Sequence, residues 1–123
     1  MQKKILIVDD EPNIVISLEY LMKKEGFAVA IANDGDAALA MAASFQPDLV
    51  LLDVMMPKKS GYEVCQQMRG DAAQADVKIL MLTAKGRESE VAKGVALGAD
   101  AYVTKPFSTK ELVARVKSLL GMA

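Results

Sequence analysis

The stretch ILIVDDEP, residues 5–12, decides the fold and raises the first chemical question. Four branched apolar residues in a row are typical of a strand that is covered on both faces, as in a parallel sheet. The run then passes directly into Asp9, Asp10 and Glu11. Adjacent carboxylates repel one another and resist burial, so an acidic end to such an apolar strand calls for a functional explanation.

Apolar runs and helical patterns alternate along the rest of the chain. Two helical stretches open on Ser60 and Ser108, each with a glutamate three residues later, which is a capping-box signature. The fourth helical pattern, residues 88–97, contains Gly94 and should be the least firmly held, since an interior glycine costs about 1 kcal/mol against alanine. Five strand–helix units predict an α/β fold with one parallel sheet and helices on both faces. The expected strands cover residues 4–8, 27–32, 49–53, 77–82 and 101–104.

The composition narrows the classes of chemistry. A length of 123 residues and a net charge of −1 predict one domain, residues 1–123, with no non-specific grip on nucleic acid or an anionic membrane. No apolar run approaches the roughly 20 residues of a membrane span, and we expect no signal peptide. A single cysteine makes a cytoplasmic location the default. The chain has no histidine, which excludes Ser-His-Asp catalysis, histidine-bound zinc and a role as phosphohistidine donor.

Four of the expected strands end in residues that can carry chemistry. They are Asp9 and Asp10 after the first strand, Asp53 in the third, Thr83 after the fourth and Lys105 after the fifth. In a doubly wound sheet the carboxyl ends of the strands form one rim, where ligands bind. If the first and third strands are neighbours, the three carboxylates converge there and need a cation, because clustered carboxylates raise one another's pKa. Lys105 supplies one cation, and the oxygen-only ligand set predicts a hard divalent metal such as Mg²⁺ as another.

Each of these residues has an ordinary explanation when it is taken alone. Asp10 suits a helix cap, and Glu11 suits the positive end of a helix dipole. A threonine at a strand end, such as Thr83, reflects β-propensity, and a single lysine is normally solvated. These explanations fail jointly, because they require four unrelated coincidences on one rim.

The same residues stand in segments that resemble the receiver domain of two-component response regulators. The matching segments are ILIVDDEP, PDLVLLDVMMPKKSG, ILMLTAKG and GADAYVTKPFS, and the resemblance covers essentially the whole chain. It implies a single flavodoxin-like (βα)5 sheet with strand order 2-1-3-4-5. It also implies a phosphoacceptor switch of a phosphorelay, which takes a phosphoryl group from the phosphohistidine of a sensor histidine kinase or phosphotransfer protein and is not a turnover enzyme.

The resemblance assigns a role to the acidic residues and the lysine of the rim. Asp53 is implied as the phosphoacceptor. Asp10, Asp53 and the backbone carbonyl of Met55 are implied as ligands of Mg²⁺ or Mn²⁺, with Asp9 assisting through water. Lys105 is expected to pair with Asp53 and then with an oxygen of the phosphoryl group.

The resemblance also implies a conformational switch. Thr83 would donate a hydrogen bond to another phosphoryl oxygen, and Tyr102 would turn inward once Thr83 moves. The Lys105–Pro106 peptide bond is expected to be cis. Phosphorylation would change the face formed by the fourth helix, the fifth strand and the fifth helix, and that face would control an output domain or a docking partner.

The last third of the chain resembles receivers that form homodimers through this same face. Asp100, Glu111 and Arg115 match the charged pattern of those dimers, whereas Val91 and Ala101 do not. A homodimer through this face is therefore one expectation. The domain itself is expected to contact neither nucleic acid nor membrane.

Two other classes of function compete with the switch. A small phosphatase of the haloacid dehalogenase type would place a D-x-D motif after the first strand, and the sequence there is Asp9-Asp10-Glu11. A flavodoxin-like nucleotide binder would need a phosphate loop rich in glycine or hydroxyl groups, which DDEPN does not provide. Acetyl phosphate with Mg²⁺ separates the classes, because a switch gains one phosphoryl group whereas a phosphatase turns over many esters.

Overall fold

One parallel sheet organises the chain. The computed structural model describes residues 2–56, 59–84, 92–93 and 95–122. The five strands pair in the order β2-β1-β3-β4-β5, which confirms the predicted doubly wound topology. The strands are β1 (Lys4–Val8), β2 (Ala28–Ala32), β3 (Leu49–Asp53), β4 (Lys78–Ala84) and β5 (Ala101–Lys105).

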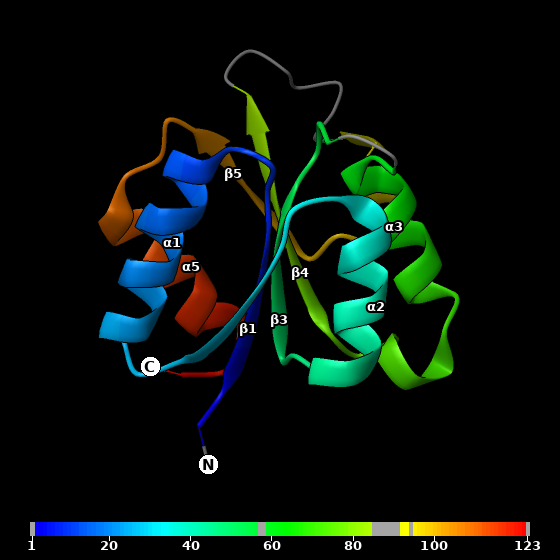
Figure 1. The fold of residues 1–123 in the computed structure, drawn as a ribbon, viewed down its shortest axis with the longest axis horizontal. Coiled ribbons are helices and arrows are strands. Elements are labelled where there is room, and N and C mark those ends of the chain that lie inside the picture. Colours follow the sequence, from blue (N-terminus) through cyan, green and yellow to red (C-terminus); the bar gives the residue numbers. More distant parts are fainter. Residues whose placement is uncertain (1, 57–58, 85–91, 94, 123) are drawn as a thin grey trace.

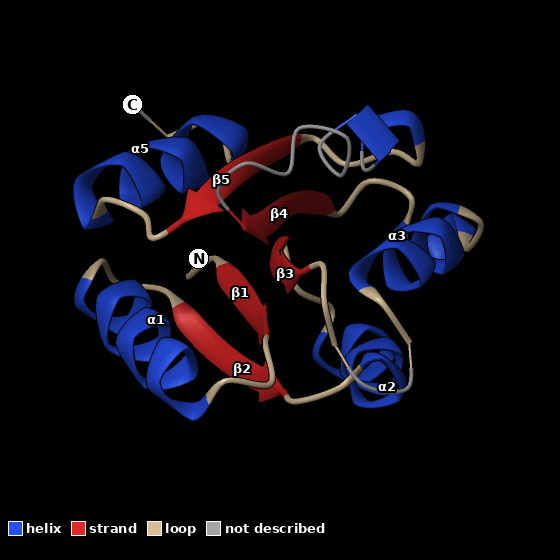
Figure 2. Cartoon of the chain, turned by 90° about the horizontal axis from the view of Figure 1, so that it is seen from above, coloured by secondary structure: helices blue, strands red, loops and turns tan. Residues whose placement is uncertain are grey.

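The helices lie in two layers, one on each face of the sheet. Figures 1 and 2 show α1 and α5 on one side and α2 and α3 on the other. The helices are α1 (Pro12–Lys24), α2 (Gly35–Phe45), α3 (Gly61–Arg69) and α5 (Thr109–Leu119), with a short 3-10 helix η1 (Ala72–Gln74). Half of the helix predicted for residues 88–97 lies outside the described residues, so its stability stays a prediction.

Short polar side chains cap the start of three of the four α-helices named above. Asp34 accepts a hydrogen bond from the backbone of Ala37 at the start of α2, and Ser108 caps α5 in the same way. Ser60 and Glu63 form the full capping box that the sequence predicts for α3. The helix α1 differs, because its N-cap residue Glu11 makes no side-chain cap bond.

The core forms because successive strand residues point to opposite faces. Leu6 and Val8 of β1 pack toward α2 and α3, while Ile5 and Ile7 pack toward α1 and α5. The central strand β3 is buried at all five positions. Burial of each large aliphatic side chain contributes roughly 1.5–3 kcal/mol, so the central strands provide a rigid base for the residues at their ends.

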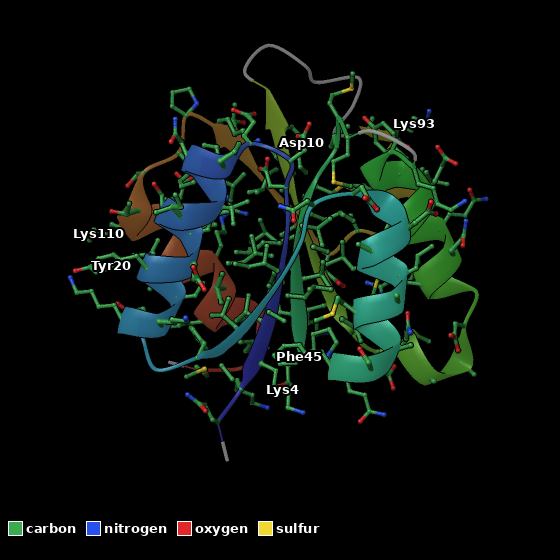
Figure 3. The ribbon with its side chains drawn as sticks, viewed as in Figure 1. Lys4, Asp10, Tyr20, Phe45, Lys93 and Lys110 are labelled. Atoms are coloured by element: carbon green, nitrogen blue, oxygen red, sulfur yellow. The ribbon has the colours of Figure 1, made fainter. Side chains whose placement is uncertain are left out.

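The two ends of the sheet differ in chemistry. Asp10 lies at the carboxyl ends of the strands, whereas Lys4 and Phe45 lie at the opposite end (Figure 3). There the Lys4 ammonium stands 5.5 Å from the centre of the Phe45 ring and bonds the Phe45 carbonyl oxygen at 3.2 Å. Among the described residues, no helix has the length and apolar character to cross a membrane.

Candidate functional site

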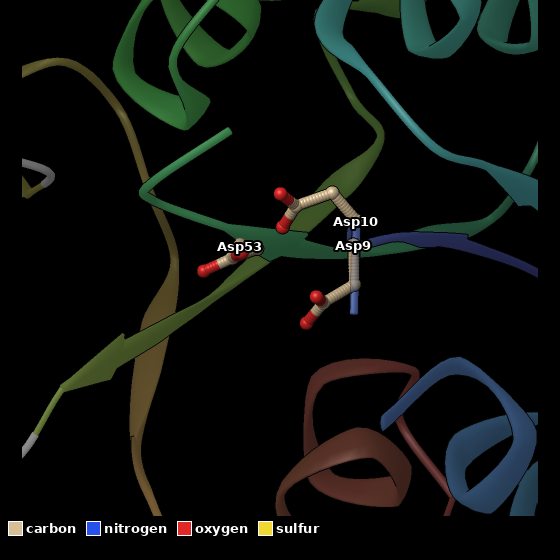
Figure 4. Close-up of side chains that lie close together, drawn as sticks. All are labelled: Asp9, Asp10 and Asp53. Atoms are coloured by element: carbon tan, nitrogen blue, oxygen red, sulfur yellow. The ribbon is translucent and has the colours of Figure 1, made fainter. Parts of the chain in front are cut away.

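Strand register brings three carboxylates together. Val8 of β1 pairs with Leu52 of β3, so the chain leaves β1 at the level where β3 ends in Asp53. Asp9, Asp10 and Asp53 each offer a carboxylate oxygen within 4.8 Å of the others (Figure 4). Asp9 is fully buried and Asp53 is 5% exposed, whereas Asp10 is exposed. The convergence expected from the sequence is therefore present in the fold.

Lys105 lies among the carboxylates rather than beside one of them. Its Nζ donates a hydrogen bond to Asp9 Oδ2 at 2.9 Å and stands 3.5 Å from Asp53 Oδ1. It also contacts Glu11 Oε1 at 3.4 Å. The resemblance implies a Lys105–Asp53 pair, and the structure adds two further acidic partners, of which Asp9 is the nearest.

Burial raises the pKa of Asp53. Loss of water around the carboxylate, followed by repulsion from Asp9, raises the pKa of Asp53 from 3.8 to about 6. The charge of Lys105 and a hydrogen bond from the Met55 backbone N–H, at 3.4 Å, act in the opposite direction. At neutral pH the carboxylate is ionised, but burial and the neighbouring Asp9 make its negative charge energetically unfavourable.

The ammonium of Lys105 responds in the opposite sense. Burial lowers the pKa of Lys105, but the hydrogen bond to Asp9 and the charges of Asp53, Asp9 and Glu11 outweigh it, so the net pKa is raised. Lys105 therefore stays protonated across the physiological range. A fixed positive charge at this rim favours an anionic ligand beside Asp53.

Thr83 provides a neutral donor at the same rim. Thr83 follows Leu82 in β4, and Leu82 pairs with Asp53 on the neighbouring strand β3. Its side chain is 2% exposed, and its hydroxyl finds no hydrogen-bond partner within the described part of the chain. A buried hydroxyl without a partner is costly, which suits a ligand oxygen that would accept its hydrogen bond.

The remaining residues of the predicted site lie around this centre. The Met55 side chain is exposed just beyond Asp53, and Tyr102 on β5 is 41% exposed, so its ring faces solvent in this conformation. The Lys105–Pro106 peptide bond is cis. The expected cis bond is confirmed, whereas the roles of Met55, Tyr102 and Lys105 stay predictions.

Glu11 is the residue whose contact the sequence did not reveal. The sequence explains its charge by the start of α1, yet its carboxylate contacts Lys105 and its backbone N–H donates to Asp9 Oδ1 at 2.9 Å. Asp10 suits a helix cap by its type, but Glu11 occupies the N-cap position. The local sequence does not show that Glu11 pairs with Lys105, because Lys105 lies 94 residues away.

A close backbone approach fixes the loop that follows Asp53. Gly61 N donates to Val54 O at 2.9 Å. A Cβ at Gly61 would collide with the Asp53 carbonyl oxygen and would lie 2.9 Å from Val54 Cα. Because both are backbone atoms beside the rim, a side chain at Gly61 must displace the segment that carries Asp53.

Gly61→Ala is expected to lower the free energy of unfolding by about 2 kcal/mol, because the added methyl group overpacks rigid backbone. Urea unfolding measures the loss. Gly70→Ala is the matched control, since a Cβ there meets only two carbonyl oxygens at 3.6 Å, and its stability should stay within about 0.5 kcal/mol of the parent. Equal stability of the two variants would contradict the close approach.

The donor set of the rim fits a hard divalent cation. The three carboxylates that converge there offer only oxygen as ligand atoms. Burial, followed by repulsion from Asp9, raises the pKa of Asp53 although Lys105 stands beside it, so a further cation would stabilise the ionised cluster. Oxygen ligands with two or more carboxylates are what Mg²⁺ and Mn²⁺ prefer. The residues present are therefore compatible with such an ion.

Comparison with known proteins assigns the family. The family model of the response regulator receiver domain matches residues 5–117. The chain belongs to the response regulator receiver domain family. It is therefore a signalling domain of two-component systems, which agrees with the predicted receiver fold and with the acidic rim of the sheet.

Several relatives support this assignment. The alkaline phosphatase synthesis transcriptional regulatory protein PhoP of Bacillus subtilis (strain 168) is 51% identical over 120 residues. That match covers 98% of this receiver domain and 49% of PhoP, so the chain spans about half the length of that relative. A protein of Chloroflexus aurantiacus J-10-fl, named as a candidate response regulator, superposes with a TM-score of 0.95 at 36% identity, over 98% of this chain and 99% of the other.

One similar structure contains a metal ion. The receiver domain of sensor histidine kinase PA1611 from Pseudomonas aeruginosa PAO1 was solved with a magnesium ion coordinated in its active site cleft. It is 26% identical to this receiver domain and superposes with a TM-score of 0.90, over 98% of this chain and 99% of the other.

Proposed function

We propose that this receiver domain is the phosphoacceptor switch of a two-component phosphorelay. Its donor would be the phosphohistidine of a sensor histidine kinase or a phosphotransfer protein, and its acceptor would be Asp53. One observation carries the proposal, namely a buried carboxylate with a raised pKa and a lysine ammonium 3.5 Å away. A carboxylate that is costly to keep charged is suited to react as a nucleophile.

The transfer would exchange the bond from phosphorus to the histidine nitrogen for a bond from phosphorus to an Asp53 oxygen. An Asp53 carboxylate oxygen attacks the phosphorus atom, the P–N bond to the histidine breaks, and the imidazole leaves with the electron pair. Lys105 would contact one phosphoryl oxygen as charge moves onto it, and the Thr83 hydroxyl would donate to another. Phosphoryl transfer depends mainly on such positioning and charge stabilisation, which this rim provides.

The three carboxylates and the backbone carbonyl of Met55 would hold Mg²⁺ or Mn²⁺. When bound, such an ion offsets the charge of the carboxylates and of the phosphoryl group. The convergence of Asp9, Asp10 and Asp53 within 4.8 Å supports this proposal, and so does the magnesium ion in the PA1611 relative.

The output of the switch would be the face that includes β5 and α5. Phosphorylation adds about −1.5 to −2 charge at Asp53, which would redraw the contacts of Thr83 and Lys105. Tyr102 would then turn from its present exposed position toward Thr83. We place this event in the cytoplasm, with an output domain or docking partner reading the face.

A homodimer through the same face has fewer charged residues to draw on than the sequence suggests. Asp100 Oδ2 accepts hydrogen bonds from Arg69 Nη2 at 2.7 Å and from Ile79 N at 2.8 Å within the chain. Glu111 and Arg115 are exposed on α5. A dimer of this kind would therefore rest on Glu111 and Arg115 more than on Asp100.

Acetyl phosphate with Mg²⁺ tests the phosphoacceptor directly. The parent chain is expected to gain one phosphoryl group by intact-mass spectrometry, and Asp53→Asn is expected to gain none. Asp76→Asn, a substitution of the same type at an exposed position remote from the rim, should gain one group like the parent. Phosphorylation of Asp53→Asn, or release of many phosphates per chain, would argue against the switch and for another acceptor or a phosphatase.

A further inference from the structure

Lys105 has as many acidic neighbours as it has hydrogens to donate. An ammonium group carries three N–H donors and no acceptor. In this chain the Nζ atom stands 2.9 Å from Asp9, 3.4 Å from Glu11 and 3.5 Å from Asp53, measured to one carboxylate oxygen of each. Each donor therefore has one carboxylate within reach, and a further anion at the rim has to compete with them for the ammonium group.

The three carboxylates differ in how easily another group can replace their contact with Lys105. Asp9 is fully buried and is further fixed by the Glu11 backbone N–H at 2.9 Å. Asp53 is nearly buried and belongs to the strand itself. The Glu11 side chain is 61% exposed, so water can replace its contact with Lys105 at little cost. Glu11 is the partner that Lys105 can exchange.

We propose that Glu11 is a positioning residue that holds Lys105 in the unphosphorylated state and competes for it with the phosphoryl group. The inference rests on the proposed function, since it assigns a role to Glu11 in the same site. The Glu11 carboxylate then favours the unphosphorylated state in two ways. It competes with the phosphoryl oxygen for one Lys105 N–H, and its negative charge repels the phosphoryl group.

The expected effect is small because the Glu11 end of the pair is largely exposed. Exposed ion pairs are screened by water, and their loss changes an equilibrium by about two- to fivefold. Glu11→Gln keeps the shape of the side chain and removes its charge. This substitution should therefore make the phosphoryl-bound state about two- to fivefold more favourable.

Beryllofluoride, a mimic of the phosphoryl group, provides the equilibrium measurement in the presence of Mg²⁺. Glu11→Gln is expected to bind it about two- to fivefold more tightly than the parent. Glu19→Gln is the matched control, because Glu19 lies on α1, away from the rim, and pairs with Lys23 at 3.0 Å. It makes the same change of net charge, and its affinity for beryllofluoride should equal that of the parent.

A second readout needs no phosphoryl group. The ammonium hydrogens of Lys105, followed by nuclear magnetic resonance, should exchange with water faster in Glu11→Gln than in the parent or in Glu19→Gln. Unchanged or weaker beryllofluoride binding by Glu11→Gln, or an equal gain in Glu19→Gln, overturns the role of Glu11 alone. A parent chain that binds no beryllofluoride contradicts the proposed function, and this inference with it.

Discussion

Arg69→Met is expected to destabilise the receiver domain by about 3 kcal/mol, one of the two largest effects predicted for a single side chain. Arg69 is the last residue of α3, and its guanidinium joins three separate segments of the chain. Its acceptors are the carbonyl oxygens of Ala75 at 3.1 Å, Val77 at 2.6 Å and Gly98 at 2.9 Å, and Asp100 Oδ2 at 2.7 Å. Bonds to a charged group are each worth about 1.5–3 kcal/mol, and partial exposure reduces the sum.

Methionine keeps the apolar stem of Arg69 in place, so the loss reports on the guanidinium bonds. Urea unfolding gives the change in free energy. Arg115→Met, an exposed position on α5, removes the same charge and should change the stability by less than about 0.5 kcal/mol. An Arg69→Met loss below about 1 kcal/mol would mean that water donates to the four acceptors in place of the guanidinium without cost.

The Arg69 contacts also show where sequence reasoning ended. By sequence alone, Asp100, Glu111 and Arg115 all match a pattern of dimer charges. In the fold, Asp100 binds Arg69, which lies 31 residues earlier in the chain. A charge pattern along the sequence does not reveal which charges are already paired inside the chain, because the pairing depends on loops whose path the pattern does not describe.

The features that were predicted well are those with a local cause. The first and third strands have the predicted bounds, because a continuous apolar run is its own signal for burial. The capping box at Ser60 was found because both of its members lie within one turn. The convergence of Asp9, Asp10 and Asp53 followed from topology, since the ends of parallel strands share one rim.

The features that the sequence does not predict depend on which of several possible partners a residue contacts in the fold. Lys105 could reach any acid at the rim, and only the fold shows that Asp9 is nearest and that Glu11 takes part. β4 extends to Ala84, two residues beyond the expected end, because pairing with β5 continues to Lys105. The partner strand, rather than the local sequence, sets that boundary.

Asp53→Asn is expected to stabilise the metal-free receiver domain by about 3 kcal/mol at pH 7.5. The pKa of Asp53 is raised from 3.8 to about 6 in the folded state, first by burial and then by Asp9. Above pH 6 the carboxylate is ionised in both the folded and the unfolded state. The charge destabilises the folded state by about 1.4 kcal/mol for each unit by which folding raises the pKa. The amide carries no charge and removes that cost.

The sign of the pH dependence follows from the same shift. Between about pH 6 and pH 4 the folded chain binds a proton at Asp53 that the unfolded chain does not, so acidification stabilises the folded parent relative to Asp53→Asn. The advantage of Asp53→Asn should therefore be full at pH 7.5 and should shrink as the pH falls through 6. Chemical unfolding in a chelator, at several pH values from 5 to 8, measures it.

Two controls make this stability difference specific to the buried charge. Asp76→Asn, which is exposed, should show a small difference from the parent that does not vary with pH in this range. Added Mg²⁺ should reduce the advantage of Asp53→Asn, because a cation at the rim offsets the charge of the parent cluster and stabilises its folded state by mass action. An advantage that is constant from pH 5 to 8 would show that Asp53 is not strained by its charge, and the same result would remove the main physical support for Asp53 as a buried nucleophile.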